Sequence, residues 1–288
     1  MKNGSVTALV PAYESAEFIQ KTLDSLSAQT RDDFQVVISV DLSEDDTYAV
    51  CQAHCKRDER FSVFRQEHRM GYVGNCNFLL SRTNSDYVLF AFHDDCLAPD
   101  YIEKLSRVLD DRQNVIMAYS DLLLTYVNGT SEVCTYPEMD RLQDRVQRGL
   151  LVVRQKGLWW VPNRGMFRLR RARDIRGLKA HAAGEFSADL PWLFHMSLLG
   201  EFARVPETLC FKYYMPGSIT RTWKRTRKQY YAVYSACLRE LGDSCLSLLE
   251  KAHIVLFMAP RLAKLRIGSF LESARASGME RDRSIDNK

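Results

Sequence analysis

The sequence has no apolar run that approaches the roughly 20 residues a membrane-spanning helix needs. Its start, Met1 to Thr7, also lacks the apolar core of a signal peptide and leads directly into a strand-like segment. Internal repeats and low-complexity linkers are absent as well. We therefore expect a cytoplasmic, globular protein whose 288 residues bury a full core.

The sequence also lacks a C-x-x-C pair, although it contains 8 cysteines. Cys51, His54 and Cys55 could share one helix face, but no second ligand pair of suitable spacing follows them. Because a structural zinc site needs four close ligands, we expect reduced and mostly buried thiols instead.

No glycine-rich phosphate loop follows the first strand-like segment, and the pattern G-x-G-x-x-G is missing. These absences argue against a dinucleotide dehydrogenase and against a nucleotidyltransferase that makes nucleotide sugars.

Charge is distributed unevenly along the chain. Residues 201–288 contain 16 Lys and Arg against 9 Asp and Glu, a net charge of +7, whereas residues 1–200 carry −3. A basic region of this kind favours anionic partners such as phosphates or an acidic lipid surface. We expect no nucleic-acid partner.

Strand-like and helix-like segments alternate in the first part of the chain, which predicts βαβ units and a mainly parallel sheet. The expected strands are Val6–Val10, Phe34–Val40, Phe61–Phe64 and Tyr87–Phe92, and the expected helices are Glu14–Ala28, Thr47–Lys56, Val73–Leu80 and one opened by Pro99. Further along, the pattern predicts strands at Val115–Tyr126, Glu132–Thr135, Phe202–Pro206 and Leu209–Tyr214, a loosely patterned helical stretch over 137–158, and a helix at Asp189–Leu199. From Trp223 onward the pattern is helical, with a break expected at Pro260.

Two adjacent carboxylates, Asp94 and Asp95, follow the buried strand Tyr87–Phe92. Open α/β sheets bind ligands at the carboxyl ends of their strands, and hard oxygen ligands there suit a divalent cation that bridges phosphates. The alternative is a solvated turn in which an Asp caps the following helix.

Four stretches, taken together in order and spacing, resemble the family-2 inverting glycosyltransferases of the GT-A fold. The first is Ala8–Tyr13 with the helix after it, and the second is Val36–Asp41 with Ser43 and Asp45–Thr47. The third is Gly71 and Asn77 followed by Asp86–Phe90 and Asp94–Asp95. The fourth is Gly165–Arg168 followed by Ala188–Asp189 and Gly200–Glu207. The resemblance runs from about Val6 to Ser218 and implies an α/β, Rossmann-like domain with a mainly parallel sheet flanked by helices. That domain would span residues 1–220, with a nucleotide-sugar half at about 1–120 and an acceptor half at about 121–220, followed by a helical C-terminal extension at 221–288.

By this resemblance, one group of residues holds a nucleoside diphosphate sugar linked to UDP, GDP or TDP. Pro11, Tyr13 and Asp41 would surround the base. Arg69 would lie near the diphosphate, and Asn77 would lie near the ribose. Asp95 would ligate Mg²⁺ or Mn²⁺, and Asp94 would bind the ribose or a metal-bound water. Tyr13 can stack on a base and Asp41 can accept a hydrogen bond from a ring N–H. The alternatives are core packing for Tyr13, turn chemistry for Asp41 and a solvated surface position for Arg69.

The resemblance makes Asp189 the general base that takes the proton of the acceptor hydroxyl, with Glu185 in reserve. Pro191 is typical of a first helical turn, so Asp189 would lie at a helix N-terminus, where the helix dipole would lower its pKa. Asp189 could instead only cap that helix. Trp160 and Arg164, next to Trp159, are candidates for an acceptor site, because aromatic faces stack on sugars, or for the core.

The sequence departs from the family pattern at four positions, namely Leu42, His93, Ala188 and Met215. His93 stands where another Asp is frequent, so it either joins a metal site or makes an ordinary hydrogen bond at a strand end. The motif Gln-x-x-Arg-Trp of processive members is absent, which favours transfer of a single sugar to a glycan or lipid-linked acceptor in surface polysaccharide or glycoconjugate synthesis. The departures motivate an alternative function, a non-catalytic glycan-binding or assembly protein on the same scaffold.

The C-terminal segment combines apolar positions from Ile254 to Leu271 with Arg261, Lys264 and Arg266. This composition is typical of a helix lying on an anionic membrane surface at the inner face of the membrane. Packing on its own domain or on a second copy in a homo-oligomer explains it equally well.

Overall fold

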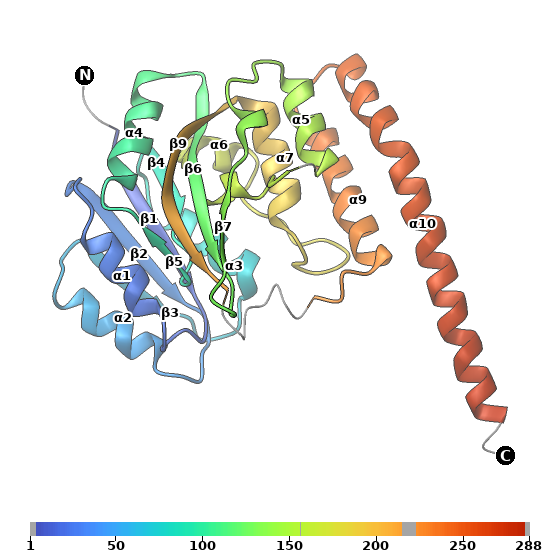
Figure 1. Ribbon diagram of the computed structural model, residues 1–288, viewed down its shortest axis with the longest axis horizontal. Helices are drawn as coiled ribbons and strands as arrows, with labels where there is room; N and C mark the ends of the chain where they lie inside the picture. The colour runs from blue at the N-terminus through green and yellow to red at the C-terminus, as the bar shows by residue number, and fades with distance from the viewer. Residues whose placement is uncertain (1–3, 156, 215–222, 286–288) are drawn as a thin grey trace.

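A single nine-stranded sheet runs through the protein, with helices packed around it (Figure 1). The structure, a computed structural model, describes residues 4–155, 157–214 and 223–285, with side chains described as far as Glu272. Met215, Ser218 and the expected domain boundary between residues 220 and 221 lie outside this part. The fold is the α/β architecture that the sequence predicts.

The strands follow the spatial order β3-β2-β1-β4-β8-β6-β9-β5, with β7 paired to β6. Their bounds are β1 Val6–Ala12, β2 Phe34–Val40, β3 Phe61–Arg65, β4 Tyr87–Phe90, β5 Asp95–Leu97, β6 Val115–Thr125, β7 Ser131–Cys134, β8 Met166–Arg168 and β9 Glu201–Tyr213. β3, β2, β1 and β4 are mutually parallel, as expected, and β6 and β9 are also parallel. β8, β5 and β7 join antiparallel, so the second half of the sheet is mixed.

Helices connect the strands and form most of the C-terminal part. Their bounds are α1 Ile19–Ser27, α2 Thr47–Cys55, α3 Gly71–Ser81, α4 Tyr101–Asp111, α5 Arg145–Arg154, α6 Leu169–Asp174, α7 Asp189–Leu199, α9 Arg227–Asp243 and α10 Leu248–Ile285, with short 3-10 turns at Pro137–Met139 and Val161–Arg164. β1 is buried over its whole length, as a central strand covered on both faces must be. α4 turns Ile102, Leu105 and Leu109 to the core, the positions that its helical spacing predicts.

The structure corrects several local predictions. The first helix begins at Ile19 rather than Glu14, because the backbone of Ser15 to Phe18 forms a turn that starts from a positive φ at Glu14. The strand before the paired carboxylates ends at Phe90 rather than Phe92. The segments expected as two strands around Pro206 form one strand, β9, whose register against β6 shifts near Ser120. β8 and α6 had no counterpart among the expected elements.

The chain ends in a long helix that projects past the rest of the molecule (Figure 1). α10 continues through Pro260, where a break was expected, because the helix packs against α9 and α5 on both sides of that residue. Within the described residues, no helix is both long enough and apolar enough to cross a bilayer.

Candidate active site

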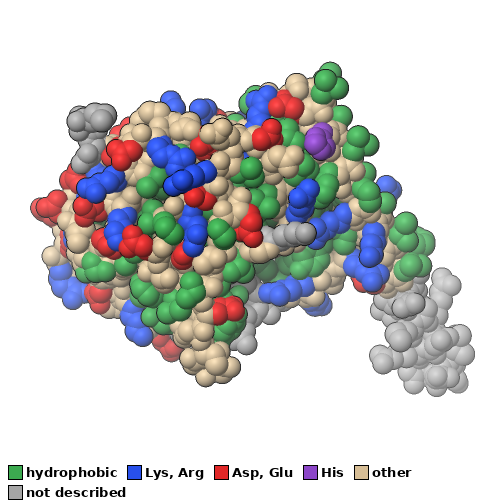
Figure 2. Space-filling model, turned by 45° about the horizontal axis from the view of Figure 1, so that its top comes forward, with side chains coloured by type: hydrophobic (Ala, Val, Ile, Leu, Met, Phe, Trp, Pro, Cys, Tyr) green, Lys and Arg blue, Asp and Glu red, His purple; other side chains and the backbone are tan. Residues whose placement is uncertain are grey.

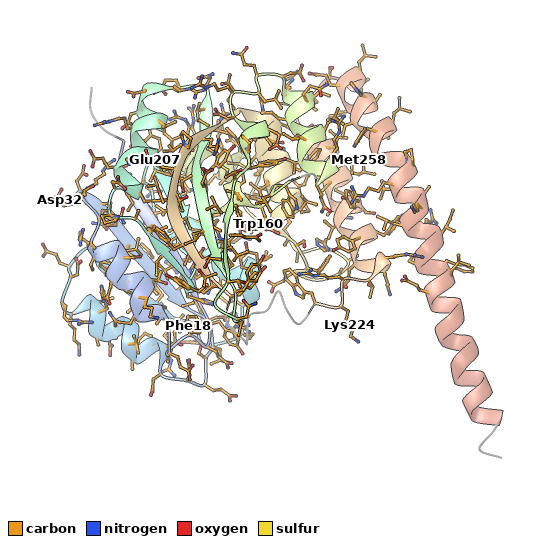
Figure 3. The ribbon with its side chains drawn as sticks, viewed as in Figure 1. Phe18, Asp32, Trp160, Glu207, Lys224 and Met258 are labelled. Carbon is orange, nitrogen blue, oxygen red and sulfur yellow. The ribbon has the colours of Figure 1, made fainter. Side chains whose placement is uncertain are left out.

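A cavity of about 560 Å³ opens where the carboxyl ends of β1 and β4 face α7 and the start of α9. Its lining includes eight residues that the sequence singled out, namely Tyr13, His93, Asp94, Trp159, Trp160, Arg164, Glu185 and Asp189. Figure 3 labels Phe18 and Trp160, which line the cavity from the N-terminal and the later half of the chain. The fold therefore gathers these side chains from segments far apart in sequence.

The expected base-binding residues lie together because β1 and β2 are parallel and end side by side, with Ala12 paired to Val40. Tyr13 and Asp41 are the next residues of the two strands. The guanidinium carbon of Arg69 lies 3.2 Å from the centre of the Tyr13 ring. Arg69 thus belongs to the same cluster as Tyr13 and Asp41, and it covers one face of the ring on which a base would stack.

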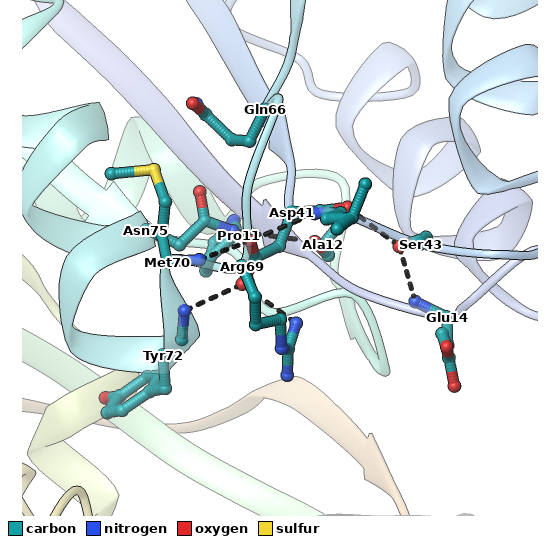
Figure 4. A network of polar contacts seen from close by, with 12 residues as sticks. Pro11, Ala12, Glu14, Asp41, Ser43, Gln66, Arg69, Met70, Tyr72 and Asn75 are labelled. Atoms are coloured by element: carbon teal, nitrogen blue, oxygen red, sulfur yellow. Dashed lines mark hydrogen bonds and ion pairs between the residues drawn. The ribbon is translucent and has the colours of Figure 1, made fainter.

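Asp41 is almost completely buried and accepts hydrogen bonds at both carboxylate oxygens (Figure 4). Oδ1 accepts from the backbone N–H of Met70 at 2.8 Å, and Oδ2 accepts from the N–H of Gly71 at 2.9 Å and from Nη1 of Arg69 at 2.8 Å. The carboxylate therefore holds the turn before α3 against the end of β2. Neither Asp41 nor Arg69 is itself part of the cavity lining.

Asp94 and Asp95 are each paired with a cation contributed by a distant segment. Nζ of Lys212 lies 2.7 Å from Oδ2 of Asp94 and 3.5 Å from Oδ1 of Asp95. Nε of Arg164 donates to Oδ2 of Asp95 at 2.9 Å. All four side chains are buried or nearly so, and their formal charges cancel.

Lys212 is the functional residue that sequence reasoning missed. It lies on β9 directly opposite Asp95 on β5 in an antiparallel pair. Burial pushes the pKa of Asp94 upward, but the Lys212 ammonium and neighbouring cations outweigh it and lower that pKa overall. The available signal was a single Lys within the otherwise apolar segment Leu209–Tyr214.

The two carboxylates have the donor chemistry that Mg²⁺ or Mn²⁺ requires, and Asp94 faces the cavity. In the described part of the chain no third His, Cys, Asp or Glu completes a cluster with them. His93 also lines the cavity; its Nδ1 lies 3.1 Å from the carbonyl oxygen of Pro11 and its ring packs on Phe18, which is the ordinary strand-end hydrogen bond that the sequence left as one alternative. A cation held here would take its other ligands from phosphate oxygens and water, and it would displace Lys212.

Asp189 begins α7 and lines the cavity, as the sequence predicts. Burial raises its pKa to about 6, against the lowering effect of the Arg164 charge and of the first backbone N–H groups of the helix. The helix N-terminus therefore acts in the expected direction, but burial outweighs it and the pKa is raised overall. Nδ2 of Asn163 donates to Oδ2 at 3.3 Å, which leaves the carboxylate open to a ligand in the cavity.

Glu185, the reserve candidate for the base, has both oxygens engaged. Its carboxylate accepts the backbone N–H groups of Tyr72 and Val73 at 3.0 and 2.7 Å and so caps α3 from 112 residues away. Gly71 makes this contact possible, because a Cβ there would lie 2.6 Å from the Glu185 carboxylate and its φ is +74°. Glu185 positions the loop before Asp189.

Two of the remaining predicted residues serve the framework. Asn77 donates to the carbonyl of Leu178 at 2.8 Å and accepts from its N–H at 2.9 Å, so the amide joins α3 to a loop and is not among the cavity-lining residues. Pro11 lies in β1, where its carbonyl oxygen holds His93.

Arg164 and Trp160 form one wall of the cavity. The guanidinium carbon lies 5.2 Å from the centres of both the Trp160 and the Phe92 rings, while the Arg164 backbone carbonyl accepts a bond from the hydroxyl of Tyr101. Trp223, Arg225 and Tyr230 also line the cavity, from the first turn of α9 and the residues just before it; we call this part of the lining the rim.

The family model described as "Glycosyl transferase family 2" matches residues 7–122. Similar relatives include EpsH of Bacillus subtilis (strain 168), named as a glycosyltransferase, with 30% identity over 41% of this chain and 34% of its own length. The GalNAc(5)-diNAcBac-PP-undecaprenol beta-1,3-glucosyltransferase of Campylobacter jejuni is 31% identical over 31% of this chain and 29% of its own length. The matched segment thus spans about a third of these two relatives.

Solved structures of glycosyltransferases resemble the chain over most of its length. TarS of Staphylococcus aureus (residues 1–349 in complex with UDP-GlcNAc) superposes with a TM-score of 0.66 and 16% identity, covering 86% of this chain and 69% of that one. The mannosyltransferase PcManGT from Pyrobaculum calidifontis, in complex with GDP-Man and Mn²⁺, gives a TM-score of 0.57 and 15% identity, covering 92% of this chain and 79% of that one. At these identities the likeness establishes the GT-A fold.

Proposed function

We propose, on the premise that residues 7–122 belong to glycosyl transferase family 2, that the protein is an inverting, non-processive glycosyltransferase. It moves one sugar from a nucleoside diphosphate, linked to UDP, GDP or TDP, to a hydroxyl group of a glycan or lipid-linked acceptor. The observation that carries the proposal is the single cavity lined by Tyr13, Asp94, Lys212 and Asp189. A base-stacking ring, a charged cluster for the diphosphate and a carboxylate near neutrality are the parts that this reaction needs.

The acceptor hydroxyl oxygen attacks the anomeric carbon from the side opposite the diphosphate. The new C–O bond forms as the bond from that carbon to the phosphate oxygen breaks, and the diphosphate leaves with the electron pair. Asp189 takes the hydroxyl proton, for which a pKa of about 6 is well matched, since the carboxylate is ionised at neutral pH and still basic. Attack and departure on opposite faces invert the configuration.

Lys212 and Arg164 supply positive charge next to the leaving diphosphate while the carboxylates hold them. A metal ion at Asp94 and Asp95 would take the place of Lys212, and Arg164 would remain. Asp94 and Asp95 would hold Mg²⁺ or Mn²⁺, whose chemistry when bound is to neutralise the diphosphate charge. Trp160 would stack on the acceptor. We place the reaction in the cytoplasm, at the inner face of a membrane, in polysaccharide or glycoconjugate synthesis. Self-association of the protein into a homo-oligomer is compatible with this reaction.

One observation favours the alternative of a non-catalytic glycan-binding or assembly protein. Arg69 covers one face of the Tyr13 ring and Lys212 bridges both carboxylates, so the protein's own cations already occupy the places expected for the base and the metal ion. A donor must displace Arg69 from the ring before a base can stack on that face.

Calorimetric titration with UDP, GDP and TDP, with and without Mn²⁺, tests the proposal. We expect one of the three to bind, and Asp189→Asn to keep that binding while it abolishes turnover. If none of them binds, the enzyme hypothesis fails. If Asp189→Asn leaves the function of the protein in the cell unchanged, the non-catalytic alternative is supported instead.

A further inference from the structure

α10 carries apolar side chains on two opposite sides. On the inner side Ile254 and Met258 are fully buried, and Leu265 packs partly against the core next to α9. This side explains how the helix is attached to the protein. The other side has no partner within the described residues, although it is equally apolar.

The outer side of α10 carries exposed large hydrophobic residues in two groups, one near each end of a stripe, with the smaller Pro260 and Ala263 between them. Leu249 is 85% exposed, Leu256 74%, Ile267 63% and Phe270 74%. At about 100° per residue these four positions fall within one face, about 60° wide, and they extend over about 30 Å of helix. In Figure 2 hydrophobic side chains run along the right-hand edge of the molecule, over this helix.

The charges that border this apolar stripe are positive. Lys264 and Arg266 lie about 80° to either side of its centre by helical geometry. The two acidic side chains of α10 within the described residues face elsewhere, because Glu250 pairs with Arg145 at 2.7 Å and Glu272 pairs with Arg227 at 3.4 Å. An exposed apolar face with basic margins complements an anionic lipid surface. Among the side chains described as far as Glu272, a second copy on this stripe would meet no acidic residue along its margins to pair with Lys264 and Arg266.

The same helix is tied to the rim of the cavity. Arg261 donates to the backbone carbonyls of Val153 and Arg154 and to Oε1 of Gln155, which lines the cavity. At the far end of the described side chains, Gly268 lies against Arg227 at the start of α9, close in sequence to the rim residue Arg225. A surface that binds the stripe is therefore held in a fixed relation to the cavity mouth.

We infer that the outer stripe of α10, Leu249 to Phe270, binds the surface of an anionic membrane and holds the cavity mouth beside it. The inference rests on the proposed function and refines it, since an enzyme held in this way would draw its acceptor from the lipid-linked class. Both the apolar stripe and its basic margins contribute, so binding requires anionic lipid and weakens as salt is added.

Vesicle sedimentation tests the inference on the full chain. The vesicles contain phosphatidylcholine alone or phosphatidylcholine with phosphatidylglycerol. We expect the wild type to bind the anionic vesicles at least about tenfold better than the neutral ones. Leu256→Glu, and separately the pair Lys264→Glu and Arg266→Glu, should each lower that binding about tenfold or more. The matched control is Val133→Glu on β7, where the side chain is 56% exposed and far from α10 in the sequence, and it should bind like the wild type.

Three results would overturn the inference. The first is that the wild type fails to sediment with anionic vesicles. The second is that Val133→Glu loses as much vesicle binding as Leu256→Glu. The third is that Leu256→Glu dissociates a dimer in sedimentation velocity while its vesicle binding is unchanged, which would make the stripe a contact between copies. Nucleotide calorimetry on the same preparations separates the two proposals, because loss of vesicle binding with retained nucleotide binding contradicts only the membrane contact.

Discussion

Asp189→Asn should make the protein more stable and nearly inactive at once. The carboxyl group has a pKa of about 6 in the folded protein, compared with 3.8 for an unperturbed Asp. A difference of about 2 units corresponds to about 3 kcal/mol by which the folded protein disfavours the ionised form. The asparagine side chain has nearly the same shape and carries no charge, so it avoids this cost.

The direction of the pH dependence follows from the raised pKa. Below about pH 4 the carboxyl group is protonated in both folded and unfolded chains, so its charge costs nothing. Between about pH 4 and 6 the unfolded chain ionises first, and wild-type stability falls as pH rises. At pH 8 the full cost is present. Because Asp189 faces an open cavity, we expect the variant to gain about 1–3 kcal/mol there, which corresponds to several degrees in Tm.

Thermal unfolding of the wild type and Asp189→Asn at pH 4.5 and pH 8 measures this effect. The Tm difference should favour the variant at pH 8 and shrink at pH 4.5, while kcat falls by about 10²–10⁴ because the general base is gone. Wild-type turnover should decline below about pH 6. The matched control is Asp94→Asn, which leaves Lys212 with only its longer contact to Asp95 and should lower Tm at pH 8, since the pKa of Asp94 is shifted in the opposite direction. Equal Tm values for wild type and Asp189→Asn at both pH values would refute the reasoning.

Three further variants test individual contacts. Lys212→Met leaves two buried carboxylates with one cation, so without metal its Tm should drop by an amount equivalent to about 3–5 kcal/mol. Mn²⁺ should raise the Tm of this variant more than that of the wild type. An equal effect of Mn²⁺ on both proteins would contradict competition between Lys212 and the ion. Glu185→Ala removes the cap of α3 and should cost about 1–2 kcal/mol in chemical denaturation, whereas an unchanged midpoint would show that the two N–H bonds contribute nothing. Gly71 and Gly129 both have a positive φ, +74° and +83°, but only a Cβ at position 71 meets the Glu185 carboxylate. Gly71→Ala should therefore destabilise by at least about 1 kcal/mol more than the matched variant Gly129→Ala.

Local patterns in the sequence predicted several elements well. β2 and α7 have the expected bounds, Phe34–Val40 and Asp189–Leu199, because a continuous apolar run and a proline in the first helical turn are strong local signals. The same kind of signal misled at Pro260, where contacts with neighbouring helices keep α10 intact. Short strands such as β5 and β8 depend on distant partners and carried no local pattern.

The sequence alone determined the order of the longer strands and helices along the chain, the carboxylates at the strand ends and the resemblance to a transferase family, since each depends on local patterns and on their order in the chain. The tertiary structure decided which charges meet. Lys212 reaches Asp94 from 118 residues away and Glu185 caps α3 across 112, contacts that no local spacing encodes. Burial reversed the expected pKa shift of Asp189, because desolvation depends on everything that surrounds a group, whereas the helix dipole acts only within the first turn.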